Sequence, residues 1–109
     1  MKTFVINGIA WKVLFVPGSS TELLRSDGSR TVGMTSWVTR TIYLAQELRG
    51  AFLEKVLCHE LCHVFCFSYG IMIDIRQEEF LADWISLYGR DVIDTLDYLL
   101  SQIYKRDRA

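Results

Sequence analysis

Hydrophobic and polar positions alternate in the first part of the chain with the period expected for β-strands. Residues 3–6 and 9–16 are rich in β-branched and aromatic side chains, and Asn7-Gly8 between them is a strong signal for a two-residue hairpin. The segment 31–45 is also predicted to be one strand. The pattern therefore indicates a small N-terminal sheet, antiparallel or mixed.

The strand predicted for residues 31–45 has an unusual distribution of side chains between its two faces. Apolar residues lie on one face, whereas Thr35, Trp37 and Thr39 lie together on the other. Such a face is either a solvated side of the sheet or part of a binding surface, and the pattern alone does not separate these interpretations.

Apolar residues recur with helical spacing in the second part of the chain. Residues 52–68 form the first such segment, and Gly70 is placed to end it. Asp74 with Gln77 resembles a capping box in front of a second helix over residues 75–88. Gly89 interrupts the pattern, and a third helix is predicted over residues 91–104. Strands followed by helices indicate a single α+β domain over residues 1–109.

The charge of the chain is nearly balanced, with 12 basic and 13 acidic residues and a net charge of −1. This balance argues against a nucleic-acid-binding surface, which is normally basic. No apolar run is long enough to span a membrane, and the N-terminus lacks the features of a signal peptide. Three cysteines cannot all pair within one chain, so we expect free thiols and a cytoplasmic location.

The cysteines Cys58, Cys62 and Cys66 form a stripe on the first predicted helix. Free cysteine is among the most buried residue types, so this stripe is expected to face the core. Ligation of a metal by a thiolate is the alternative, but the stripe lies roughly 100° around the helix from the histidines.

The strongest chemical signal is the sequence His59-Glu60-Leu61-Cys62-His63. Two histidines four residues apart lie on the same face of a helix, so both imidazoles can reach one metal ion. The glutamate between them is the general base in the H-E-x-x-H motif of zinc metallopeptidases. Both histidines of the chain belong to this motif, which predicts that it binds one zinc ion.

A catalytic zinc site usually has three protein ligands, and no third histidine exists in this chain. Glu79 is the preferred third ligand, because Asp83 lies one helical turn later and can accept the outer N–H of a ligand histidine. Glu78 is the main competitor, but the residue one turn after it is Ala82, which cannot accept a hydrogen bond.

The H-E-x-x-H motif followed by Glu79-Phe80-Leu81-Ala82-Asp83 on a later helix resembles the gluzincin metallopeptidases. The small size resembles the minigluzincins and related peptidases of phages and mobile elements. This resemblance assigns His59, His63 and Glu79 to the metal. It also implies that the strand over residues 31–45 is a sheet edge that pairs with an extended peptide substrate, which favours a binding role for Thr35, Trp37 and Thr39.

The resemblance implies hydrolysis of a peptide or protein substrate, with Glu60 as general base. The larger gluzincins add a histidine or tyrosine that stabilises the oxyanion, and here only a tyrosine is available. The sequence does not choose among the five candidates, which are Tyr43, Tyr69, Tyr88, Tyr98 and Tyr104. Two alternatives stay open: a latent enzyme, and a zinc-binding module without turnover that clamps a protein partner.

Overall fold

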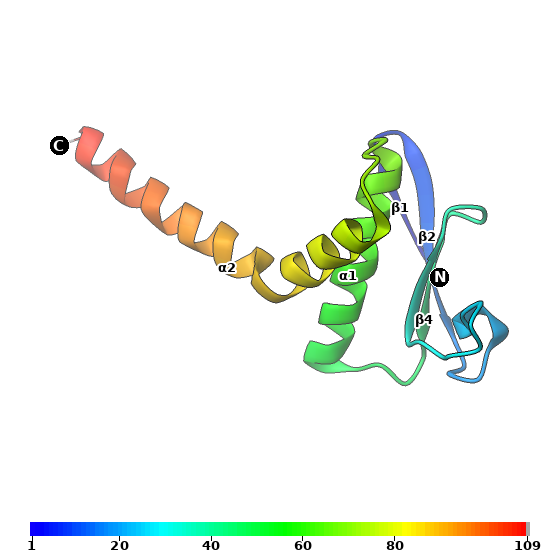
Figure 1. Ribbon diagram of the computed structural model, residues 1–109. Coiled ribbons are helices and arrows are strands. Elements are labelled where there is room, and N and C mark those ends of the chain that lie inside the picture. Colours follow the sequence, from blue (N-terminus) through cyan, green and yellow to red (C-terminus); the bar gives the residue numbers. More distant parts are fainter. Residues whose placement is uncertain (109) are drawn as a thin grey trace.

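The computed structural model describes the backbone of residues 1–108 and the side chains of residues 1–105. A four-stranded mixed sheet is followed by two helices, which confirms the α+β fold (Figure 1). The strands lie in the order β1-β2-β4-β3; the central pair, β2 and β4, is parallel and the two outer pairs are antiparallel. Their bounds are β1 (Lys2–Ile6), β2 (Ile9–Val16), β3 (Gly33–Ser36) and β4 (Thr41–Ala45).

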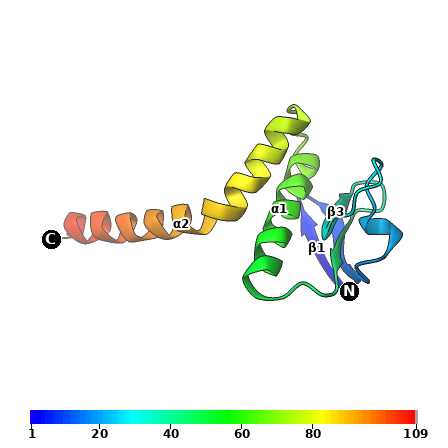
Figure 2. The same ribbon diagram turned by 60° about the horizontal axis from the view of Figure 1, so that its bottom comes forward.

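The remaining elements are the short 3-10 helix η1 (Thr21–Leu23) and the helices α1 (Gly50–Ser68) and α2 (Ile75–Arg108). Helix α1 packs on the sheet, and the first part of α2 packs on α1 (Figures 1 and 2). The main core lies between the sheet and α1, and its fully buried side chains include Trp11, Leu23, Ile42, Leu44 and Val64. This packing holds α1, which carries the histidine motif, against strands β3 and β4.

The hairpin predicted at Asn7-Gly8 is confirmed. Both residues have positive φ angles, 49° at Asn7 and 77° at Gly8, as a tight turn between twisted strands requires. The Asn7 side chain donates to the carbonyl oxygen of Ser68, and the indole of Trp11 donates to the Ser68 hydroxyl. These bonds attach the C-terminal end of α1 to the first hairpin.

The prediction of a single strand over residues 31–45 was wrong, because β3 and β4 are two antiparallel strands joined by a tight turn. Arg40 adopts a left-handed φ of 52° in this turn, and the Ser36 hydroxyl accepts a hydrogen bond from the backbone N–H of Thr39. The turn contains no glycine, proline or asparagine, so its composition gave no signal. Strand β3 is left at the edge of the sheet.

The first predicted helix and its terminator are confirmed. Helix α1 ends at Ser68, and Gly70 follows with a φ of 66°. The backbone N–H of Ile71 donates to the carbonyl of Cys66, and that of Gly70 donates to Phe67. These bonds close the helix as a Schellman motif. The chain then reverses, and the Asp74 carboxylate accepts from the backbone N–H of Arg76 to cap α2.

The predicted break at Gly89 was wrong, since α2 is one continuous helix of 34 residues. A single glycine within a helix costs only about 1 kcal/mol relative to alanine, so it does not end a helix whose neighbours favour one. Helix α2 nevertheless bends where its colour passes from yellow to orange, and the rest of it projects away from the domain (Figures 1 and 2). Within residues 1–108, no helix has the length and apolarity needed to cross a membrane.

Candidate metal centre

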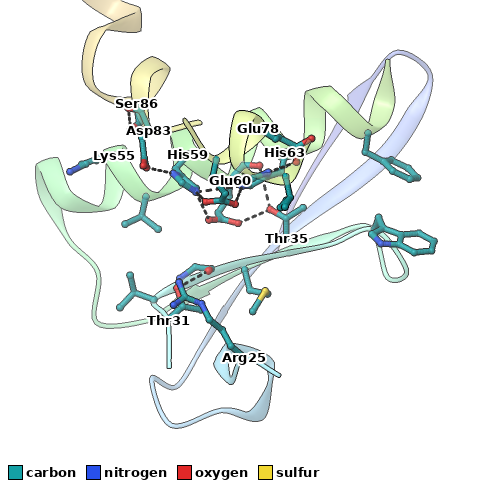
Figure 3. Close-up of a pocket in the computed structure, with 18 of the residues that line it drawn as sticks. Arg25, Thr31, Thr35, Lys55, His59, Glu60, His63, Glu78, Asp83 and Ser86 are labelled. Atoms are coloured by element: carbon teal, nitrogen blue, oxygen red, sulfur yellow. Dashed lines mark hydrogen bonds and ion pairs between the residues drawn. The ribbon is translucent and has the colours of Figure 1, made fainter. Parts of the chain in front are cut away.

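A cleft of about 680 Å³ runs between α1 and the edge strand β3. One wall comes from the α1 residues His59, Glu60 and His63, and the other from residues 31–35 (Figure 3). Helix α2 adds three carboxylates to the same cleft, from Glu78, Glu79 and Asp83. The histidine motif on α1 and the acidic residues of α2, which the sequence predicts to form one site, therefore line the same cleft.

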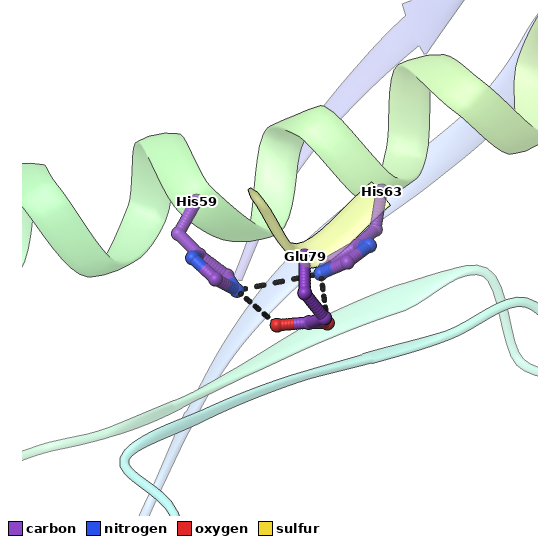
Figure 4. Close-up of side chains that lie close together, drawn as sticks. All are labelled: His59, His63 and Glu79. Atoms are coloured by element: carbon purple, nitrogen blue, oxygen red, sulfur yellow. Dashed lines mark hydrogen bonds and ion pairs between the residues drawn. The ribbon is translucent and has the colours of Figure 1, made fainter. Parts of the chain in front are cut away.

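Three side chains converge at the centre of this cleft (Figure 4). The Nε2 atoms of His59 and His63 lie 3.4 Å apart. The Glu79 carboxylate approaches both, at 3.2 Å from Nε2 of His59 and 2.9 Å from Nε2 of His63. One ligand atom from each residue lies within 4.8 Å of the others, and the group can hold a metal ion.

The distances between these atoms fit a small metal ion. Around an ion with bonds of about 2.0–2.1 Å, tetrahedral ligand atoms lie about 3.3–3.4 Å from one another. The two Nε2 atoms are separated by about that distance, and the two oxygens of the Glu79 carboxylate lie 3.2 Å and 2.9 Å from Nε2 of His59 and His63 respectively.

The outer nitrogens of both rings have carboxylate partners. Nδ1 of His59 lies 2.9 Å from Oδ1 of Asp83, as the prediction for Asp83 requires. Nδ1 of His63 lies 2.6 Å from Oε2 of Glu78. Assigned from these partners, the Nδ1 atoms carry the protons and the Nε2 atoms are free to accept. Two lone pairs and a carboxylate then face one another, an arrangement that a cation between them would stabilise.

Glu78 does not occupy the third ligand position, for which the sequence made it a candidate. It does not compete with Glu79 for the centre of the site but orients the His63 ring from the outer side. Consecutive residues differ by about 100° around a helix, so two neighbouring glutamates can reach opposite sides of one imidazole. That geometry was available from the pair Glu78-Glu79 and was missed.

Glu60 is buried, with 7% of its surface exposed, and lies beside the cluster rather than in it. The Thr35 hydroxyl donates to Oε1 of Glu60 at 2.8 Å. The other carboxylate oxygen lies 4.0 Å from Nε2 of His59. Thr35 thus holds one oxygen of this carboxylate, while the other oxygen faces the centre of the site.

Gly33 permits the close approach of β3 to α1. A Cβ atom at this position would lie 2.7 Å from Cγ1 of Val56 and 3.3 Å from Cγ of Glu60. Any larger residue would therefore push the edge strand away from the Glu60 side chain. No local sequence pattern marks this glycine, because the need for it comes from packing between elements far apart in the chain.

Of the three residues predicted to lie on the edge strand, one lies in it and two do not. Thr35 lies in β3, but Trp37 and Thr39 lie in the turn after it. Trp37 still lines one end of the cleft, where its ring stacks on Phe67 with centroids 5.9 Å apart. The Thr39 hydroxyl lies 3.2 Å from the hydroxyl of Tyr43, which is outside the cleft.

The tyrosines do not complete the site. Within the described part of the chain, no tyrosine is among the residues that line the cleft. The cationic side chains of the lining are Arg25, beside β3, and Lys55, one turn before His59 on α1 (Figure 3).

Two of the three cysteines pack in the interface between α1 and α2. Cys62 and Cys66 are buried with Ala82 where α1 and α2 cross, and no cysteine within residues 1–108 belongs to the metal cluster. Burial raises the pKa of Cys62 to about 12, and also raises the pKa of Cys66, so both remain neutral thiols near neutral pH. The core-facing prediction for these two residues is confirmed, and small side chains let the helices approach closely.

Comparison of this chain with protein-family models, with curated proteins and with solved structures finds no match.

Proposed function

We propose that this chain is a small zinc-dependent peptidase in which His59, His63 and Glu79 hold the metal. Two imidazoles and one carboxylate form a typical ligand set for catalytic zinc, which keeps a further position free for reactants. A bound zinc ion supplies Lewis acidity, which makes water more acidic and polarises a carbonyl group. The identity of the metal belongs to the proposal.

The observation that carries the proposal is the position of Glu60. Its buried carboxylate is held by Thr35 on one oxygen and faces His59 with the other. A site built only for structural metal binding has no use for such a group. In the proposed reaction, Glu60 accepts the proton of the attacking water and later passes it to the leaving amine.

The substrate is proposed to be an extended peptide. Strand β3 pairs only with β4, so the backbone groups of its other edge are available along the cleft. A peptide that adds to this edge would gain main-chain hydrogen bonds and pass in front of the metal ligands. Its side chains would meet Lys55 and Arg25 on the wall of the cleft and Trp37 at one end.

One observation favours the alternative of a latent enzyme or a non-catalytic module that clamps a partner. The described cleft has no tyrosine and no further histidine to stabilise an oxyanion. The same edge strand and metal centre would then bind a protein segment without cleaving it.

Glu60→Gln separates these functions. The full chain, loaded with one equivalent of zinc, is incubated with a mixed peptide library, and new termini are identified by mass spectrometry. The wild-type chain should produce metal-dependent cleavages that stop after chelation. Glu60→Gln should keep its zinc and lose at least about 100-fold in rate, because the general base is absent.

Glu54→Gln is the matched control, since Glu54 lies on the same helix with an exposed side chain, away from the cleft. It should cleave like the wild-type chain. Equal rates for Glu60→Gln and wild type would contradict the role of Glu60. Zinc binding without any cleavage by the wild type would favour the non-catalytic module, and failure to bind zinc would contradict both.

A further inference from the structure

The distal segment of α2, defined as residues 90–105, has an apolar stripe that nothing in the structure covers. Its members Val92, Leu96, Leu99 and Ile103 are 46–50% exposed. Apart from the ion pair of Arg90 with Glu54 of α1, the segment projects from the domain and runs beside no other element (Figures 1 and 2). Residues 92–103 extend over roughly 17 Å of helix, so the stripe is a continuous surface and not a set of isolated side chains.

A helix of this composition is not expected to be stable alone in water. Isolated helices of about 12–15 residues are marginal even when they are rich in alanine. The distal segment contains aspartate at positions 91, 94 and 97 and β-branched residues along the stripe, all of which have lower helix propensity. Burial of the apolar stripe against a partner would stabilise the helix.

The spacing of the stripe indicates another helix as the partner. Its residues are separated by four, three and four positions, which is the seam of a two-stranded coiled coil. The series reads the same in both directions. A second copy that runs antiparallel therefore places Val92 opposite Ile103, and Leu96 opposite Leu99, with every apolar residue meeting another.

The charges favour the same arrangement. Asp91, Asp94 and Asp97 outweigh Arg90 and make the first half of the distal segment acidic, whereas residues 98–104 carry no charge and Lys105 follows them. Parallel copies would place each aspartate beside its counterpart, whereas antiparallel copies place the acidic half of each helix beside the uncharged residues 98–104 of the other, with Arg90 opposite Lys105. The aspartates on the polar face also oppose binding to an anionic membrane, where basic residues are needed.

We propose that the distal segment of α2 is a dimerisation surface, and that its partner is the same segment of a second copy in an antiparallel coiled coil. The metal centres lie on the other part of each chain, so the two clefts remain accessible. The seam is short, which makes the dimer dependent on protein concentration.

Sedimentation equilibrium of the full metal-loaded chain tests the proposal. The wild-type mass should rise from one chain to two as the concentration increases. Leu99→Asp should remain monomeric throughout that range. Tyr98→Asp is the matched control, because it adds the same charge at the next position, is 63% exposed and lies outside the stripe. It should dimerise like the wild type.

A wild-type chain that is monomeric at every concentration, or one that forms larger assemblies, would overturn the proposal. So would equal dimerisation by Leu99→Asp and Tyr98→Asp. If Leu99→Asp does not fold, Leu99→Ala replaces it and should shift the midpoint of dimerisation to higher concentration. An unchanged midpoint would count against the stripe.

Disulfide trapping tests the orientation. Val92→Cys and Ile103→Cys are made separately in a chain that also carries Cys58→Ser, which removes the more accessible native thiol. Mixed under mild oxidation, the two variants should cross-link to each other, whereas neither should cross-link to itself. Efficient self-cross-linking of each variant would show a parallel pair and overturn the antiparallel arrangement.

Discussion

The Nδ1 atom of His63 lies 2.6 Å from Oε2 of Glu78. The Nε2 atom of the same ring lies 2.9 Å from the carboxylate of Glu79. Two consecutive residues of α2 therefore lie on opposite sides of one imidazole, and the hydrogen bond to Glu78 fixes the orientation in which Nε2 faces Glu79. A candidate metal ligand held in this way is oriented without the metal.

Loss of the charge at Glu78 should weaken metal binding. Glu78→Gln keeps a hydrogen-bond acceptor but removes the charged carboxylate that orients the His63 ring, and such changes typically reduce affinity 10–100-fold. Competition with a chelator of known affinity measures the change. The same substitution at the exposed Glu54 is the control, and equal affinities for the two variants would argue against an orienting role.

Removal of the Thr35 hydroxyl should destabilise the buried Glu60 carboxylate. Thr35→Val keeps the shape of the side chain but leaves that carboxylate without its donor, which should lower the free energy of unfolding by about 1–3 kcal/mol. Thr35→Ser restores the hydroxyl and should recover most of the loss. Denaturant unfolding compares the variants, and the prediction fails if valine and serine behave alike.

A methyl group at Gly33 should destabilise the protein. Gly33→Ala would force Val56 and β3 apart, and overpacking of this kind costs about 1–3 kcal/mol. Gly18→Ala provides the contrast, because the new Cβ would meet only the carboxylate end of the exposed and flexible Glu47 side chain. Thermal unfolding should show a lower midpoint for the first variant and no such loss for the second.

The thiol of Cys62 should make stability depend on alkaline pH. Its folded pKa is raised to about 12 by burial, above the ordinary value of 9.0. The contribution of the neutral thiol is fully present below pH 9.0 and is lost as the pH rises toward 12, because the unfolded chain then releases a proton that the folded chain retains. Urea unfolding at several pH values measures this loss.

Cys62→Ala should reduce the alkaline dependence, even though the smaller side chain lowers stability at every pH. An identical pH dependence in both proteins would contradict the assignment. A thiol reagent at pH 8 gives an independent check: Cys58, which is only half-buried, should react before the buried Cys62 and Cys66.

The sequence predicted the parts of the site that depend on helical spacing. His59 and His63 share a face because they are four residues apart, and Glu79 with Asp83 repeats that spacing on α2. The structure brings all four together, with Asp83 beside His59 and Glu79 beside both rings. The first hairpin was equally predictable, since Asn7-Gly8 tolerates the positive φ angles of its turn.

The parts that were missed depend on contacts between distant segments. Alternation through one continuous strand places Thr35 on the face opposite the apolar residues. The turn changes the phase: Thr35 pairs with Ile42, so both side chains lie on the face toward α1, and Val38 is 75% exposed in the turn. The close approach at Gly33 likewise exists only after folding, and no local pattern reports it.

The division of the metal ligands between α1 and α2 has a mechanical consequence. Glu79 lies near the start of a helix that continues to Arg108. The distance along that helix is roughly 45 Å, so a tilt of only about 10° at the site would move its far end by about 8 Å. A small tilt of α2 on binding or release of the ion would thus become a large displacement of its far end. Fluorophores attached to the sheet and to the distal end of α2 would report this displacement as a change in the efficiency of energy transfer.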